Sequence, residues 1–290
     1  MELVIRAKKP ETIKRMMHEN NIPVKIIEKK DRHLEIYVAK NLKTRKDTIK
    51  KGENVHFFIN DEGIDKRIKP EDKTIDIIYE DDYLLIVNKP AGMPVMVSKS
   101  HREGTLANAL MHHFLKQKIK NHIHFVNRVD KQTSGLVLVA KHKFIAFLLS
   151  DKVGALITHH YHAILDGVLP VKEGCIDLPI SRKEGSIERE VSEKGKECKT
   201  NYKVEKEFLN KSLVRIRLNK NRTHQIRVHF AHFDAPILGD YIYNPESSSE
   251  DLLMLVADRM VFKHPVTDEQ IDKKISFPEP FQAYLNKYSR

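Results

Sequence analysis

The sequence predicts an α+β protein in which a small N-terminal α+β domain precedes a central mixed, largely antiparallel sheet with flanking helices and a cleft. Short strand-like runs alternate with helical segments through residues 74–290, as in a mixed sheet covered by helices. No glycine-rich phosphate loop is present, which argues against a dinucleotide-binding fold. The 290 residues, 40% of them hydrophobic, are enough for a full-sized core and two domains.

The N-terminal domain is expected to occupy residues 1–60. It begins with a short amphipathic helix at residues 11–20, in which Ile13, Met16 and Met17 recur at helical spacing.

Strand-like runs follow this helix at residues 24–27, 34–39 and 55–59, and the second of them alternates apolar and polar side chains. Residues 61–73 are polar and contain glycine and proline, which predicts a linker. The larger domain then spans residues 74–290.

Three segments of the larger domain have clear patterns. Residues 83–88 and 136–140 are apolar runs that suit buried strands. Residues 105–115 place Leu106 and Leu110 four positions apart, which predicts a helix.

The composition favours a cytoplasmic protein with a polyanionic partner. No apolar run reaches membrane-spanning length, and the first residues lack a signal-peptide pattern. Cys175 and Cys198 have no metal-binding spacing, which is typical of a reducing compartment. The net charge is +11, and residues 1–70 carry 18 basic and 11 acidic side chains, or +7 of that excess. Such a surplus favours nucleic acid, because phosphate contacts release counterions.

The most informative segment is residues 125–141, where a polar turn separates two apolar runs. The turn holds Arg128 and Asp130 two positions apart, and Gly135 permits tight backbone geometry where the second run begins. Taken alone, an aspartate in this setting is more often a turn or capping residue than a catalyst.

The sequence of this segment resembles the Arg-Leu-Asp-x-x-Thr-Ser-Gly-Leu-Leu-Leu-x-Ala-Lys signature of the RluA-type pseudouridine synthases. The resemblance implies that Asp130 is the catalytic nucleophile. Val129 replaces the usual leucine, and Asn127 stands where many members have histidine. Residues 81–95 are also similar to the opening motif of the family, and the resemblance extends over residues 77–280.

A second matching segment is His160-Tyr161-His162-Ala163, which resembles the Lys-x-Tyr-x-Ala strand of the family with His159 at the lysine position. The resemblance implies that Tyr161 stacks on the target base and participates in proton transfer. A tyrosine on an apolar strand is otherwise usually a core residue.

A third segment, Arg222-Thr223-His224-Gln225-Ile226-Arg227, matches the Arg-Thr-His-Gln-Ile-Arg part of a family motif, whereas Lys220 and Asn221 depart from it. Because a buried carboxylate needs a guanidinium to stay ionised, we expect Arg222 to pair with Asp130. Loss of the family's glycine at Asn221 is expected to stiffen or redirect this loop.

The same segment is expected to begin a helix that Thr223 caps, with Ile226, Phe230 and Phe233 on its apolar face.

The predicted catalytic residues are therefore Asp130, Tyr161 and Arg222. The substrate-binding residues that the resemblance implies are Lys89, Arg128, Thr223, His224 and Gln225.

The expected function is site-specific isomerisation of uridine to pseudouridine in structured RNA, either ribosomal or transfer RNA, by a cytoplasmic and monomeric enzyme. This chemistry needs no redox change and no cofactor, and we expect neither a cofactor nor a metal. The densest histidine groups, at residues 112–113, 159–162 and 229–232, lack the His-Glu-x-x-His or cysteine-pair patterns of metal sites.

The first alternative is an inactive RNA-binding or ribosome-assembly factor on the same fold, with activity lost through the changes at Asn127, Lys220 and Asn221. A metal-dependent RNA hydrolase comes third, and a chelator would affect its activity. A second resemblance is faint: Lys50-Lys51-Gly52-Glu53 before the last N-terminal strand is similar to a turn of the small alpha-L RNA-binding domain. A domain that only packs against the larger one is the competing interpretation.

Overall fold

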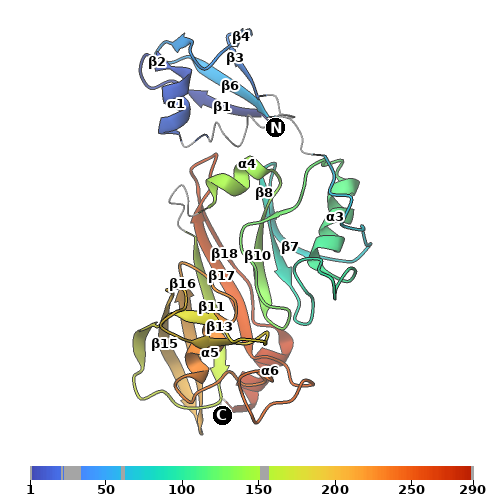
Figure 1. The fold of residues 1–290 in the computed structure, drawn as a ribbon, viewed down its shortest axis with the longest axis vertical. Helices are drawn as coiled ribbons and strands as arrows, with labels where there is room; N and C mark the ends of the chain where they lie inside the picture. The colour runs from blue at the N-terminus through green and yellow to red at the C-terminus, as the bar shows by residue number, and fades with distance from the viewer. Residues whose placement is uncertain (1, 21, 23–33, 60–62, 151–156, 289–290) are drawn as a thin grey trace.

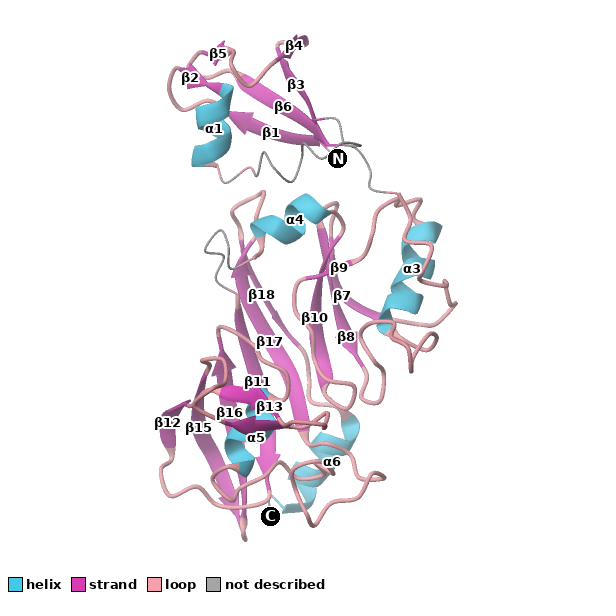
Figure 2. Cartoon of the chain, viewed as in Figure 1, coloured by secondary structure: helices cyan, strands magenta, loops and turns pink. Residues whose placement is uncertain are grey.

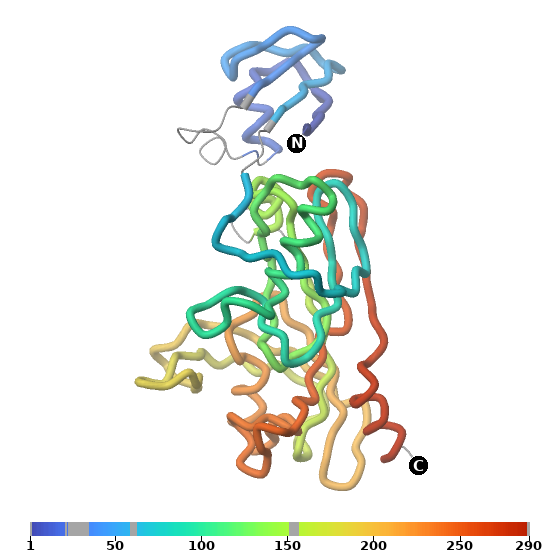
Figure 3. Tube along the Cα trace, turned by 90° about the vertical axis from the view of Figure 1, so that its right-hand side faces the viewer, coloured from blue at the N-terminus to red at the C-terminus, as the bar shows by residue number. Residues whose placement is uncertain are grey.

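The computed structural model of the protein describes residues 2–20, 22, 34–59, 63–150 and 157–288. They form a small N-terminal unit at one end of the long axis and a larger body, as Figures 1 and 3 show. None of the described helices is long and apolar enough to cross a membrane.

In its described residues, the N-terminal unit is a four-stranded antiparallel sheet with one helix. The strand order is β1-β6-β3-β4, with a separate short β2–β5 pair beside it. The elements are β1 (Glu2–Arg6), β2 (Glu11–Thr12), α1 (Ile13–Glu19), β3 (Leu34–Val38), β4 (Asn41–Lys43), β5 (Thr48–Ile49) and β6 (Asn54–Ile59).

The predicted helix at 11–20 and the strands at 34–39 and 55–59 are confirmed as α1, β3 and β6. Met16 and Met17 of α1 are buried, as the helical spacing indicated. The run at 24–27 lies outside the described residues. Residues 63–75 carry neither helix nor strand.

The body is built on a ten-stranded mixed sheet, which confirms the predicted fold class (Figure 2). The strand path is β12-β15-β16-β11-β17-β10-β8-β7, with β18 beside β17 and β9 beside β10. Among the described pairs, β10 and β17 are parallel and the others are antiparallel. The strands are β7 (Asp76–Glu80), β8 (Leu84–Lys89), β9 (His124–Phe125), β10 (Ser134–Ala140), β11 (Thr158–Leu165), β12 (Glu173–Asp177), β15 (Lys199–Phe208), β16 (Lys211–Leu218), β17 (Leu255–Lys263) and β18 (Gln270–Lys274).

Helices and one hairpin complete the body. The hairpin pairs β13 (Ile180–Arg182) with β14 (Arg189–Val191). The helices are α3 (Leu106–Lys116), α4 (Lys143–Leu148), α5 (Gln225–Ala231) and α6 (Glu279–Tyr288).

Strand β10 lies at the centre of the body and is buried along its whole length. Val137 and Val139 on one face pack in the same cluster as Leu110 and Phe114 of α3. The opposite face packs with α4. A strand that is covered on both faces has a continuous apolar sequence, which is why residues 136–140 could be predicted as a buried strand.

Gly135 allows β10 to start directly against β17. Its φ of +112° is a left-handed conformation, and a β-carbon there would overlap the backbone of Ala257. Only glycine therefore permits the parallel register of Ser134 with Val256, which sets where the preceding turn and Asp130 lie.

Candidate active site

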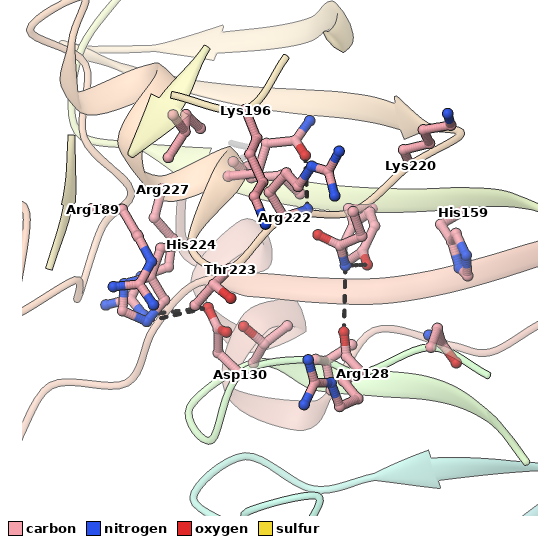
Figure 4. Close-up of a pocket in the computed structure, with 18 of the residues that line it drawn as sticks. Arg128, Asp130, His159, Arg189, Lys196, Lys220, Arg222, Thr223, His224 and Arg227 are labelled. Atoms are coloured by element: carbon pink, nitrogen blue, oxygen red, sulfur yellow. Dashed lines mark hydrogen bonds and ion pairs between the residues drawn. The ribbon is translucent and has the colours of Figure 1, made fainter. Parts of the chain in front are cut away.

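Asp130 lies in a cleft of about 1100 Å³ beside the parallel strands (Figure 4). Its carbonyl accepts a hydrogen bond from the Thr133 amide at 3.2 Å, which closes the turn before β10. The side chain is 24% exposed, so the carboxylate faces the cleft but is largely shielded from water.

The guanidinium beside Asp130 belongs to Arg227 of α5. Arg227 Nη1 lies 3.4 Å from Asp130 Oδ2. The same guanidinium donates two hydrogen bonds, of 2.7 and 2.6 Å, to the fully buried carboxylate of Asp240. This bidentate bond fixes the planar fork of Arg227, so the cation is held in place for Asp130.

The expected ion pair between Asp130 and Arg222 is wrong. Among the described residues Arg222 makes no ion pair, and no dashed line joins it to Asp130 in Figure 4. Arg222 lines the same cleft, and its buried Nε has no hydrogen-bond partner in the described part of the chain. The guanidinium that stabilises the carboxylate comes from five residues further along the motif.

The reason lies in the start of α5. The helix begins after His224, which has a left-handed φ of 58° and makes no side-chain capping bond. Thr223 is exposed and does not cap the helix, and Phe233 is 47% exposed, so both of these expectations are wrong. The left-handed residue turns the chain between Arg222 and the helix, and it is Arg227 that the first turn of the helix brings to Asp130.

His224 is the second cationic candidate beside Asp130, with Nε2 lying 3.8 Å from Oδ2. Its Nδ1 lies 2.8 Å from the hydroxyl of Tyr243. Burial lowers the pKa of His224, although the charge of Asp130 acts in the opposite direction. At neutral pH the imidazole is therefore mainly neutral, and the persistent positive charge beside Asp130 is that of Arg227.

Lys89 holds the site together and is not available to a phosphate. Its side chain is fully buried, and Nζ donates hydrogen bonds to the carbonyls of Pro90, Met93 and Lys131 at 2.7, 2.8 and 3.1 Å. Burial lowers its pKa to about 7, against the charge of Asp130. Lys131 follows Asp130 directly, so the bond to its carbonyl ties Lys89 to the turn that carries Asp130. The fully buried ammonium of Lys89 therefore has a structural role in place of the predicted substrate-binding one.

Gln225 is likewise occupied by its own chain. Its Nε2 donates to the Lys199 carbonyl and to Thr200 Oγ1, both at 3.0 Å. Its Oε1 accepts from the Arg222 amide at 2.9 Å. The buried amide therefore shapes the loop before α5 and is not free for substrate. Thr223 and Arg128, in contrast, are exposed in the cleft.

Tyr161 lies on β11 and lines the cleft with 2% of its surface exposed. Burial, and to a lesser extent the charge of Asp130, raises its pKa, so the phenol keeps its proton. Its hydroxyl accepts a hydrogen bond of 3.0 Å from Asn221 Nδ2, which also lies 3.3 Å from the Arg128 carbonyl. A carbonyl can only accept, so the amide nitrogen must face this way, and the Tyr161 hydrogen remains free to donate elsewhere.

Asn221 stands where the family motif has glycine. Its side chain connects the loop before α5 to Tyr161 on β11 and to Arg128 in the turn before β10. The departure that could have disrupted the site instead ties its loop to Tyr161 and to the turn of Asp130.

The remaining lining of the cleft is strongly basic. Eight basic side chains and a single carboxylate, that of Asp130, are found among its described lining residues. The basic residues are Arg128, Arg182, Arg189, Lys194, Lys196, Lys220, Arg222 and Arg227.

The histidine groups form no metal-binding arrangement in the described part of the chain. His162 instead contacts Asp258 at 2.9 Å and Glu205 at 3.3 Å. His229 contacts Thr200 and the Leu178 carbonyl.

Comparison with known proteins agrees with this site. A family model described as RNA pseudouridylate synthase matches residues 83–232. The chain is 31% identical over 244 residues to the uncharacterized RNA pseudouridine synthase YjbO of Bacillus subtilis, which covers 83% of this chain and 86% of the relative. It is 34% identical over 233 residues to ribosomal large subunit pseudouridine synthase D of Pasteurella multocida, with 75% and 72% covered.

A solved structure shows the same fold. Human RNA pseudouridylate synthase domain containing 4 superposes with a TM-score of 0.60, covering 74% of this chain and 93% of that chain at 22% identity. The chain therefore belongs to the RNA pseudouridylate synthase family. It is an isomerase of the RluA type that forms pseudouridine from uridine in RNA, which confirms the family and the enzyme class that the Asp130 segment predicted.

Proposed function

We propose that this enzyme modifies specific uridines in structured RNA, with Asp130 as the nucleophile and without a cofactor. The observation that carries the proposal is the position of Asp130 as the single carboxylate beside eight basic side chains among the described lining residues of the cleft. Cations draw the phosphate backbone into the cleft, and the carboxylate then meets the sugar of the target nucleotide. Ribosomal RNA is the favoured substrate, because several relatives are named as synthases of the large ribosomal subunit.

In the proposed reaction, the Asp130 carboxylate attacks C1′ of the ribose, and the bond from C1′ to N1 of uracil breaks with its electron pair moving to the base. The detached base turns so that C5 faces C1′. C5 then displaces the carboxylate from C1′, and the ring loses its C5 proton while N1 gains one. Arg227 holds the carboxylate of Asp130 in place for the first step and faces it again as an anion after the last.

The target uridine has to leave any base stack before Asp130 can reach its sugar, at a cost of a few kcal/mol. We propose that Tyr161 supplies the flat surface for the base, and that Arg128, exposed beside the nucleophile, fills the vacated space or contacts a neighbouring phosphate. Arg222 is proposed to contact RNA as well, since its guanidinium has no carboxylate partner among the described residues.

The function is tested by mapping pseudouridine in RNA from cells that lack this protein. We expect one or a few sites to be missing, and we expect the purified protein to restore them in RNA from those cells. Unchanged maps, together with no pseudouridine formed by the purified protein on ribosomal or transfer RNA, would refute the proposal.

Replacing Tyr161 by phenylalanine should lower kcat and leave RNA affinity nearly unchanged. The ring that stacks on the base remains, whereas the hydroxyl that Asn221 orients is lost. Tyr161→Leu should weaken both affinity and turnover. Single-turnover rates and filter binding on the same RNA measure the two effects, and a wild-type rate for Tyr161→Phe would reduce Tyr161 to a platform.

The N-terminal unit is proposed to add RNA affinity. Residues 1–70 carry most of the excess positive charge, and the residues assigned to the reaction all lie in the body.

A further inference from the structure

The β13–β14 hairpin and the turn after it form one rigid wall of the cleft. The turn folds back on β13, because the Lys196 amide donates to the Ile180 carbonyl at 2.9 Å and the Ile180 amide donates in return at 3.1 Å. A side chain at Gly195 would overlap the backbone of Ile180, so this close approach requires glycine. Lys194 and Lys196 therefore project from a fixed backbone.

The hairpin is also tied to the reactive carboxylate. The Arg189 amide donates to the Tyr243 hydroxyl at 2.7 Å, and that hydroxyl contacts His224 Nδ1 at 2.8 Å. His224 in turn lies beside Asp130. This chain of contacts fixes the distance between the hairpin and the position where the target nucleotide would lie.

Charge on the hairpin is segregated by face. Residues 180–197 contain five basic and five acidic side chains, so the segment as a whole is neutral. Four of the basic residues line the cleft, and none of the acidic residues does. The lining residues are Arg182, Arg189, Lys194 and Lys196, and the acidic residues are Glu184, Glu188, Glu190, Glu193 and Glu197.

The cations that face the cleft also lack carboxylate partners, unlike those nearby. In the described part of the chain, the side chains of Lys194 and Lys196 make no hydrogen bond or ion pair. Lys183, at the hairpin tip and outside the cleft, pairs with Glu188 at 2.8 Å. Lys199 and Lys203 on β15 pair with acidic residues at 2.6 and 3.0 Å. Within the described residues, therefore, the positive charges of the hairpin that face the cleft have no carboxylate partner.

The guanidinium groups of Arg182 and Arg189 also have no carboxylate partner among the described residues, and they bond to backbone carbonyls instead. Arg182 Nε donates to the Ser186 carbonyl at 2.8 Å, and Arg189 Nη1 donates to two backbone carbonyls of the hairpin. These bonds orient the side chains without neutralising them, and the other guanidinium N–H groups remain available to a ligand.

We propose that Arg182, Lys194 and Lys196, here called the hairpin grip, bind the phosphodiester backbone of the nucleotides that flank the target uridine. The proposal rests on the proposed function, since it identifies the RNA-holding surface of the same cleft. Phosphate contacts fix the register of a nucleic acid without reading its sequence, and a rigid wall anchored to His224 is suited to setting which uridine reaches Asp130.

The test compares two variants of the full-length protein, each measured against wild type. Lys194→Ala/Lys196→Ala removes two charges of the hairpin grip, and Lys183→Ala removes a paired charge from the same hairpin. The probe is an unmodified large-subunit ribosomal RNA transcript. Its affinity is measured from low to high salt, and KM and kcat for pseudouridine formation are measured with the same RNA. Thermal unfolding checks that each variant remains folded.

We expect the slope of log affinity against log salt to become shallower for the double variant by about 0.7–0.9 per lost phosphate contact. KM should rise more than kcat falls. Lys183→Ala should keep the wild-type slope. A wild-type slope for the double variant, or an equal change in Lys183→Ala, would overturn the proposal. If the wild-type protein forms no pseudouridine at all, the proposed function fails, and the salt slopes still decide whether the hairpin grip binds RNA.

Discussion

Asp130→Asn should reduce pseudouridine formation by about 10⁴-fold or more, the order of loss seen when a member of a nucleophilic catalytic unit is removed. The amide keeps the size of the side chain and one acceptor oxygen, but it cannot attack C1′ as an anion. RNA affinity should be retained or slightly increased, because the substitution removes a negative charge from a cleft whose described lining includes eight basic residues.

The measurement is tritium release from C5-labelled uridine in RNA under single-turnover conditions, with affinity determined in parallel. Asp272→Asn is the matched control, since Asp272 is an exposed partner of Arg259 on β18 and does not line the cleft. The control should retain wild-type turnover. Tritium release by Asp130→Asn at a rate close to wild type would remove Asp130 from the role of nucleophile.

The sequence was sufficient to predict the fold where burial produces a periodic or continuous pattern. The strand at 136–140 and the helix at 105–115 could be predicted because β10 and α3 bury apolar side chains in the same hydrophobic cluster. The strand β1 was not predicted, since its half-exposed residues give a weak pattern. The β13–β14 hairpin was missed for the same reason, because its residues are mostly polar and partly exposed.

The sequence motifs predicted which segments form the site, but they did not predict which side chains pair with each other. Asp130 and Tyr161 do line one cleft, whereas the arginine expected beside the carboxylate is Arg227. Which arginine pairs with Asp130 depends on the path of the backbone between Arg222 and α5. That path is set by the left-handed conformation of His224, which produces no periodic pattern in the sequence. One signal was available: Arg227 is embedded among the apolar residues of α5, and a buried arginine requires a carboxylate partner.

Lys89 shows the same limit. The resemblance to the family implied that Lys89 binds substrate, yet its ammonium is enclosed by three carbonyl groups of two loops. The number of acceptors around a buried donor depends on tertiary packing, which no local pattern reports.

Arg227→Lys should lower kcat strongly, while Arg222→Lys should act mainly on RNA affinity. Lysine keeps the charge at position 227 but cannot make the bidentate bond to Asp240 and reach Asp130 with the same rigid group. Without a fixed cation, the carboxylate of Asp130 should lose its orientation. At position 222 no such geometry is lost, because Arg222 has no ion pair among the described residues.

Stability separates this catalytic role from a purely structural one. Arg227→Met leaves the fully buried Asp240 without a counter-charge, and breaking a buried pair in this way costs roughly 3–5 kcal/mol of unfolding free energy. Arg259→Met is the matched control: its bidentate pair with Asp272 has similar geometry but is exposed, and should cost about 0–1 kcal/mol.

The decisive measurement is kcat and KM for Arg227→Lys at a temperature where denaturant titration shows it folded. If Arg227 orients the Asp130 carboxylate for attack on C1′, kcat should fall while KM for the RNA changes little, since lysine keeps the positive charge that attracts phosphate. A folded Arg227→Lys enzyme with the wild-type kcat would show that the contact of 3.4 Å between Arg227 and Asp130 does not support the nucleophile.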